Sequence, residues 1–122
     1  MLNKVYLVIA LWLGTFMFYG SVLVAQDISG VWQHSAKPVL LNVDLSSGLV
    51  KVKSHKNNKD SEGLTIIKNI NKNAQHPQYW FGEMYNGYIQ SYVPVELYLA
   101  STGTLLVHDA KGLEVLKLYR QK

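Results

Sequence analysis

The sequence predicts an all-β protein, a small up-and-down antiparallel β-barrel of about seven or eight strands that follows an N-terminal signal segment. Two observations lead to this fold. Short stretches rich in Val, Ile, Leu and Tyr recur roughly every ten residues after the signal segment, and Gly, Asn, Ser and Pro separate them. No stretch of this part keeps a helical apolar period for about three turns. Closing such a sheet into a barrel removes the free strand edges that invite aggregation.

Composition limits the chain to one domain and removes several kinds of chemistry. The length of 122 residues suits a single domain. The chain has no cysteine, so disulfides, thiolate nucleophiles, thiolate zinc sites and attachment of lipid to a cysteine are excluded. The net charge of +4 is a mild bias that falls well short of the basic face of a nucleic-acid-binding protein, and we expect no nucleic-acid partner.

Residues 1–25 have the pattern of a secretory signal peptide. Lys4 precedes a long apolar run, and small residues lead to a cleavage site after Ala25. Cleavage there leaves residues 26–122 as a single β-barrel domain that is exported to the periplasm or secreted. The alternative is an uncleaved membrane anchor, because residues 5–24 are long enough to span a bilayer. We expect contact with a membrane only if the leader is left uncleaved.

The first half of the domain contains the clearest hairpin. Residues 39–44 and 49–54 alternate apolar and polar side chains, which predicts two half-buried strands. Ser46-Ser47-Gly48 supplies the turn between them. Residues 55–63 are polar throughout and are expected to form an exposed loop. Together with their neighbours, the strands of this half are expected at residues 30–35, 39–44, 49–54 and 64–70.

The second half is richer in aromatic residues. Residues 71–78 are expected to form a loop, and Asn86-Gly87 is the strongest short turn dipeptide in the chain. Pro94 lacks an N–H group, so its stretch is expected to be an edge, a bulge or the beginning of a strand. The strands of this half are expected at residues 79–85, 93–99, 104–108 and 113–120.

The segment Gly30-Val31-Trp32 is expected to close one end of the barrel. In a barrel the first strand crosses close to the last, and glycine lets the two backbones approach. Trp32 points to the same side as Gly30 and fills that end of the interior. Arg120 is the only arginine and lies on the last strand, so we expect its guanidinium to stack on the Trp32 indole. The alternative is a solvated terminal arginine beside an ordinary core tryptophan.

Short motifs occur in a fixed order along the domain. They are an Ile-x-Gly-x-Trp start, a Gly-hydrophobic-x-Ile-x-Lys segment and a Trp-x-Gly strand, at residues 28–32, 63–68 and 80–82. On these motifs the chain resembles a bacterial family of small exported proteins whose function is not established. The Gly-x-Trp start and the terminal Arg120 are also similar to those of lipocalin and avidin-like barrels. The resemblance implies a β-barrel and export, and it implies no activity and no catalytic residue. The chain departs from the family at residues 107–110 and at Leu118, where the family has Arg-Gly-Tyr and Trp.

Aromatic residues are the most informative candidates for a binding site. Tyrosine and tryptophan combine a large apolar area with one polar group, which suits ligand pockets and interfaces. They suit a plain barrel core and cross-strand pairs equally well. The functional interpretation is a ligand-binding site at the rim formed by the Asn86-Gly87 turn, with the residues Trp80, Tyr85, Tyr88 and Tyr92.

The titratable residues show no spacing typical of a metal or acid–base site, and we expect no metal and no cofactor. His108 and Asp109 are neighbours on a strand and therefore point to opposite faces. Glu83 and Glu96 are expected on nearby strands as solvated carboxylates. The histidines His34, His55, His76 and His108 are expected on the surface or in loops. A basic hairpin end suits either an anionic partner or a solvated strand face and consists of Lys51, Lys53, Lys56 and Lys59.

These observations favour a non-enzymatic barrel that binds a small apolar or amphipathic ligand, or that acts as an accessory protein of the cell envelope. The alternative is a protein-interaction module, such as an inhibitor of a secreted hydrolase, that works through the loop at residues 56–63 and the aromatic turn. The state of the interior distinguishes them, because large inward side chains on every strand would leave no room for a ligand. A hydrolase or isomerase would need two titratable groups that converge inside the barrel, and the sequence places no such pair there.

Overall fold

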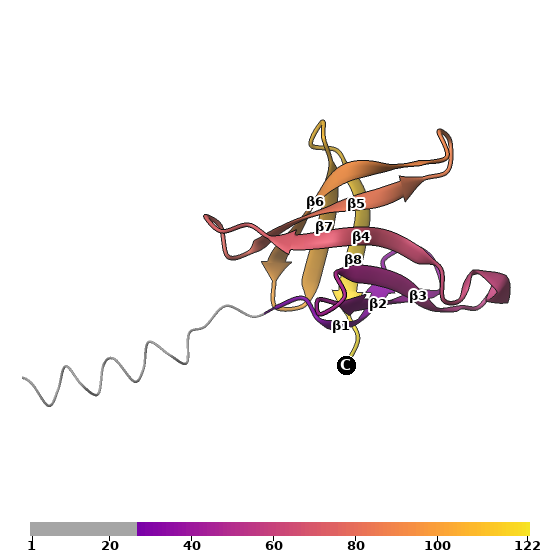
Figure 1. Ribbon diagram of the computed structural model, residues 1–122. Helices are drawn as coiled ribbons and strands as arrows, with labels where there is room; N and C mark the ends of the chain where they lie inside the picture. The colour runs from indigo at the N-terminus through magenta and orange to yellow at the C-terminus, as the bar shows by residue number, and fades with distance from the viewer. Residues whose placement is uncertain (1–26) are drawn as a thin grey trace, which may run out of the picture.

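The computed structural model describes residues 27–122, which form a closed barrel of eight antiparallel strands (Figure 1). This confirms the predicted fold. The signal peptide and its alternative, a membrane anchor, lie outside the described residues. Among residues 27–122, the only helix is a short 3-10 turn, η1 (Lys59–Ser61), and none is long and apolar enough to cross a membrane. The strands are β1 (Gly30–His34), β2 (Val39–Asp44), β3 (Leu49–His55), β4 (Thr65–Lys72), β5 (Tyr79–Asn86), β6 (Ser91–Ser101), β7 (Thr104–Asp109) and β8 (Glu114–Arg120).

The barrel is an up-and-down meander that the first and last strands close. Each strand pairs with the next one in the chain, and β8 returns to pair with β1. The closing ladder is short, with Trp32 opposite Arg120 at one end and His34 opposite Leu118 at the other. Because the chain simply alternates direction, its loops gather at the two ends of the barrel.

The two ends of the barrel differ, and we call them the closed end and the open end. The closed end carries Arg120 and the loops at residues 45–48, 73–78 and 102–103. The buried side chains of Ile28 and Trp32 fill it. The open end carries the loops at residues 35–38, 56–64, 87–90 and 110–113. In Figure 1 the β5–β6 hairpin and the β7–β8 turn project separately at the top of the molecule, and both belong to the open end.

The alternation of the sequence produces one continuous apolar core. On β2 the side chains of Val39, Leu41 and Val43 are buried, whereas Asn42 and Asp44 are exposed, as the pattern predicts. None of the buried residues of the described chain is polar or charged. Trp32 and Trp80 are the largest of them and are 0% and 2% exposed. The interior of the barrel is therefore apolar, and its two largest side chains lie toward the closed end.

The strand between the two halves is longer than predicted. β4 continues to Lys72, whereas the sequence analysis assigned residues 71–78 to a loop. A bulge between Lys68 and Asn71 makes this extension possible, with Asn69 at φ +55°. The Asn69 side chain donates a hydrogen bond to the Glu83 carboxylate on β5, which fixes the bulge to the neighbouring strand.

The turn predicted at Asn86-Gly87 is not a two-residue turn. Asn86 is the last residue of β5 and is paired with Ser91, so four residues, 87–90, connect β5 to β6. The Asn86 carboxamide accepts the backbone N–H of Tyr88 at 2.9 Å, and Gln90 rather than Gly87 takes the positive φ, at +54°. The predicted turn is present, but it is longer than the dipeptide because the asparagine side chain caps a four-residue loop instead of entering the left-handed region itself.

Gly30 is required for a different reason from the one predicted. A Cβ atom at Gly30 would lie 3.8 Å from the nearest Arg120 side-chain nitrogen, which is an ordinary contact rather than a clash. The backbone of Gly30 has φ +119°, a conformation that residues with a side chain rarely adopt. The glycine thus turns the chain into β1, and it is not needed to let two backbones approach.

Candidate functional site

The closed end is held together by the last residue of β8. The Arg120 guanidinium lies over the Trp32 ring, with its carbon 4.4 Å from the ring centre, which is the stacked arrangement that the sequence predicts. Its nitrogen atoms donate to three backbone carbonyls, those of Asp27 at 2.9 Å, Ser29 at 3.0 Å and Thr102 at 3.1 Å. The Trp32 indole N–H donates to the Ile28 carbonyl at 2.9 Å. Gly30, Trp32 and Arg120 therefore build a plug and leave no room for a ligand at this end.

The open end contains a pocket of about 610 Å³. Its lining is mainly apolar and comes from the β5–β6 hairpin and from the segment that joins β7 to β8. Tyr88 and Leu113 stand at its mouth, with 100% and 63% of their side chains exposed. The other apolar lining residues are Met84, Tyr85, Val93, Pro94, Val95 and Val115.

The pocket exists because the barrel wall separates between β6 and β7. β6 pairs with β5 from Ser91 to Tyr98, but its pairing with β7 begins only at Val95, opposite Asp109. Pro94 lies just before this point, and a residue without an N–H group is tolerated where a ladder is incomplete. The sequence allowed an edge, a bulge or the beginning of a strand at Pro94. The structure shows an edge, because β6 has no partner on β7 at this residue. The β5–β6 hairpin therefore extends beyond the neighbouring strand and opens the pocket beside it.

The polar groups of the pocket lie at its rim. The Asp109 carboxylate accepts the backbone N–H groups of Lys111 at 2.9 Å and Leu113 at 3.0 Å, so it mainly shapes the β7–β8 turn. The Asn86 side chain caps the opposite loop. The Lys111 side chain is exposed beside the mouth. The arrangement suits a ligand whose apolar part enters the barrel and whose polar part stays at the rim.

The four residues predicted to form a ligand site separate into three environments. Tyr85 and Tyr88 line the pocket. Tyr92 lies on the outer face, where its ring packs edge-on against Tyr85 at 5.5 Å and beneath the Lys68 ammonium at 4.1 Å. Trp80 is not at the rim, and this part of the prediction was wrong. Trp80 and Tyr85 lie an odd number of positions apart on one strand, so the two side chains point to opposite faces, and Trp80 is 2% exposed in the core.

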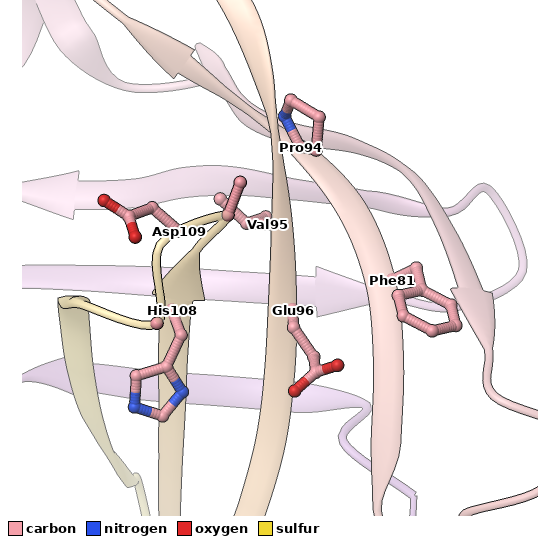
Figure 2. A pocket seen from close by; sticks show the side chains of 8 residues that line it. Phe81, Pro94, Val95, Glu96, His108 and Asp109 are labelled. Atoms are coloured by element: carbon pink, nitrogen blue, oxygen red, sulfur yellow. The ribbon is translucent and has the colours of Figure 1, made fainter.

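A second, smaller hollow of about 420 Å³ lies on the outer face of β5, β6 and β7 (Figure 2). Glu96 and His108 are paired across β6 and β7, with Phe81 on the next strand. In Figure 2 the Asp109 side chain points away from His108, as expected for strand neighbours. Glu83 is on the strand next to Glu96 but is bonded to Asn69. This hollow brings one carboxylate and one imidazole to the same surface.

The remaining histidines serve local structure. His34 Nδ1 accepts the backbone N–H groups of Ala36 at 3.0 Å and Lys37 at 3.2 Å, which forms the β1–β2 turn. Burial lowers the pKa of His34, and the charge of Lys37 lowers it further. His55 caps the next loop through the N–H of Asn57. Within residues 27–122, no group of three His, Asp or Glu side chains is placed to hold a metal ion.

The sequence analysis missed part of the pocket. Met84 and Val93 occupy inward positions of the alternating pattern, but nothing in the pattern shows that they lie where the wall is open. Leu113 and Val115 are distant from them in the sequence and reach the same pocket only through the barrel topology. The available signal was Pro94, which marks the point where a strand loses a neighbour.

Comparison of the chain with protein-family models, with curated proteins and with solved structures returns no match. The resemblance to a family of small exported proteins therefore stays a prediction.

Proposed function

We propose that this protein is an exported, non-enzymatic binding protein that takes a small apolar or amphipathic ligand into the pocket at the open end of its barrel. The observation that carries the proposal is the contrast between the two ends. One is filled by Ile28 and Trp32, and the other holds a pocket of about 610 Å³. This volume lies within the range of about 300–1,000 Å³ that is usual for small-molecule sites.

The chemistry of the lining supports binding rather than catalysis. The buried side chains of the described chain are hydrophobic, so the inner part of the pocket offers an apolar surface. The charged residues that line the pocket are Asp109 and Lys111. The Asp109 carboxylate is bonded to the backbone of its own turn. An apolar chain or ring with one polar end fits this distribution.

Binding of a fluorescent fatty acid tests the proposal. The protein is expressed from the full-length chain and titrated in solution, and the dye is expected to bind with saturation and to be displaced by unlabelled amphipathic molecules. Val93→Trp adds a large side chain inside the pocket and should abolish binding, because Val93 faces the interior next to Met84. Phe81→Trp is the matched control, since Phe81 is 47% exposed on the outer face.

Equal binding by Val93→Trp and the native chain, with both proteins folded, would place the dye elsewhere and remove the support for the pocket. The second candidate is then a protein-interaction module, for example an inhibitor of a secreted hydrolase. The fully exposed ring of Tyr88 favours this second function, because such a side chain gains contact area only when a partner covers it.

Export has its own test. Residues 1–25 are proposed to be a signal peptide, so the protein recovered from the periplasm or the medium should begin at Gln26. An intact N-terminus in the membrane fraction would show instead that the leader is an anchor.

A further inference from the structure

Large apolar side chains are exposed in three connections between strands, and all three connections lie at the open end. Leu64 is 58% exposed in the β3–β4 connection, and Leu113 is 63% exposed in the β7–β8 connection. The β5–β6 loop carries both Tyr88, fully exposed, and Ile89, 61% exposed. The exposed large hydrophobic residues of the described chain do not include any from the closed-end loops at 45–48, 73–78 and 102–103. This asymmetry marks one end of the barrel as an interaction surface.

Positive charge flanks the same tips. Exposed lysines on the open-end segments are Lys37, Lys53, Lys56, Lys59 and Lys111. The carboxylates on and beside these segments are one fewer than the lysines, namely Asp60, Glu62, Asp109 and Glu114. Of these, Asp109 is already bonded to two backbone N–H groups. Lys56 and Lys59 of the basic hairpin end therefore lie at the same end of the barrel as the exposed apolar side chains.

The geometry favours a lipid surface over a folded protein partner. The tips of the β5–β6 and β7–β8 loops, with Tyr88 and Leu113, stand at the mouth of the pocket, so they do not form one flat patch. A rigid protein partner that touched these loops would leave the hollow between them unfilled. The residues that line the hollow would then lack van der Waals contacts with the partner. Lipid chains and headgroups fill such a shape. An exposed tyrosine, exposed aliphatic side chains and lysines at the same end of the barrel form the pattern of an interfacial membrane contact.

We propose that the open end of the barrel docks on an anionic lipid bilayer. Tyr88, Ile89 and Leu113 enter the boundary between headgroups and acyl chains, and the lysines of the surrounding loops contact lipid phosphates. The mouth of the pocket then faces the acyl chains. This goes beyond the ligand pocket, since the docking residues bind lipid whether or not the barrel holds a ligand.

The described chain begins at the end of the barrel opposite to the proposed lipid contact, so this contact is distinct from a membrane anchor in the leader. The described chain begins at Asp27, whose carbonyl is bonded to Arg120 at the closed end. The sequence by itself predicts membrane contact only through an uncleaved leader. Such a leader joins the barrel at the closed end, whereas the exposed loop tips lie at the opposite end.

A single-cysteine experiment tests the docking geometry, and it is simple because the chain has no cysteine. An environment-sensitive dye is attached after Ala110→Cys at the open end or after Thr102→Cys at the closed end, both exposed positions. Each protein is expressed from the full-length chain and mixed with vesicles of phosphatidylcholine, with or without phosphatidylglycerol. We expect the dye at position 110 to shift to the blue and to be quenched by spin-labelled lipid on anionic vesicles, while the dye at position 102 stays in water.

Variants identify the side chains responsible. Serine at Tyr88, Ile89 and Leu113 together should abolish the shift at position 110. Serine at Phe81 and Tyr119, which are 47% and 44% exposed away from these loop tips, should leave it unchanged. Replacing Lys56, Lys59 and Lys111 with Gln should weaken binding by about fivefold for each lysine that lies near the surface.

The proposal is overturned if the dye at position 110 stays in water, if position 102 is quenched as strongly, if the triple serine variant binds as before, or if neutral vesicles bind equally well. These results are independent of the fatty-acid titration, which uses no vesicles. Docking on vesicles without fatty-acid binding would contradict the proposed ligand pocket and support the lipid-docking surface. Fatty-acid binding without docking would support the pocket and contradict the lipid-docking surface.

Discussion

The guanidinium carbon of Arg120 lies 4.4 Å from the centre of the Trp32 ring, and the two residues are paired directly across β8 and β1. This contact joins the last strand to the first one, where the closing ladder is short. Three further hydrogen bonds connect the same guanidinium to the carbonyls of Asp27, Ser29 and Thr102. Arg120 thus holds the closed end of the barrel together over the buried Trp32, and the pocket lies at the other end.

Removal of this side chain should be costly. Arg120→Ala loses the stacking on Trp32 and leaves the carbonyl groups of the closed end without their charged donor, so we expect a loss of about 2–4 kcal/mol in unfolding free energy. Chemical denaturation measures it. Lys117→Ala is the control, since the Lys117 ammonium lies 5.7 Å from the exposed Tyr119 ring on the outer face. Equal losses in the two variants would contradict a sealing role for Arg120.

The core tryptophan has two separable contributions. Trp32 is 0% exposed, so Trp32→Ala should cost about 3–5 kcal/mol through the cavity that it leaves. Trp32→Phe keeps much of the volume but removes the N–H that the Ile28 carbonyl accepts, which should cost about 1–3 kcal/mol. Thermal and chemical unfolding of both variants provide the measurement. A loss below ~1 kcal/mol for the alanine variant would mean that Trp32 does not fill the core.

The glycine at the entry to β1 should be sensitive to any side chain. Gly30→Ala forces a residue with a Cβ atom into φ +119°, and we expect a destabilisation of about 1–3 kcal/mol without any steric clash. Gly87→Ala is the matched control, because a Cβ atom added there would meet nothing within 4 Å and the φ of Gly87 is not positive. Denaturant unfolding in parallel should separate the two, and equal stability would refute the conformational requirement.

His34 should make stability depend on pH. Its Nδ1 accepts two backbone N–H groups only while that nitrogen carries no proton, and its pKa in the folded state is below the usual value. The unfolded chain therefore binds a proton more readily, and the stabilisation present above about pH 6.5 is lost as the pH falls further. The difference in unfolding free energy between the native chain and His34→Gln should shrink between about pH 7.5 and pH 5. A constant difference would show that His34 titrates alike in both states.

The fold was predictable because it depends on local patterns. Alternation on β2 and β3 assigned the correct faces, and the position of the only arginine on the last strand indicated its contact with Trp32. The predicted strand and loop boundaries differ from the structure where a side-chain hydrogen bond or a bulge alters the regular pattern of strands and turns. Asn86 caps a four-residue loop instead of forming a tight turn, and the Asn69 bulge lets β4 continue into the region expected to be a loop.

The candidate site was only half predictable. Tyr85 and Tyr88 are near the pocket because both lie at the end of one hairpin, which a single sequence reveals. Trp80 was misplaced, since proximity along a strand does not determine the face. Leu113 and Val115 join the site through closure of the barrel, and Pro94 signals the gap in the wall without showing which strand is absent.

Native mass spectrometry of the protein purified from its own host tests whether the open end holds a small molecule. We expect a mass above that of the polypeptide, with the excess lost on unfolding and absent from Val93→Trp. A polypeptide mass alone, from protein that also binds no fatty acid in titration, would show that the pocket at the open end holds no small molecule.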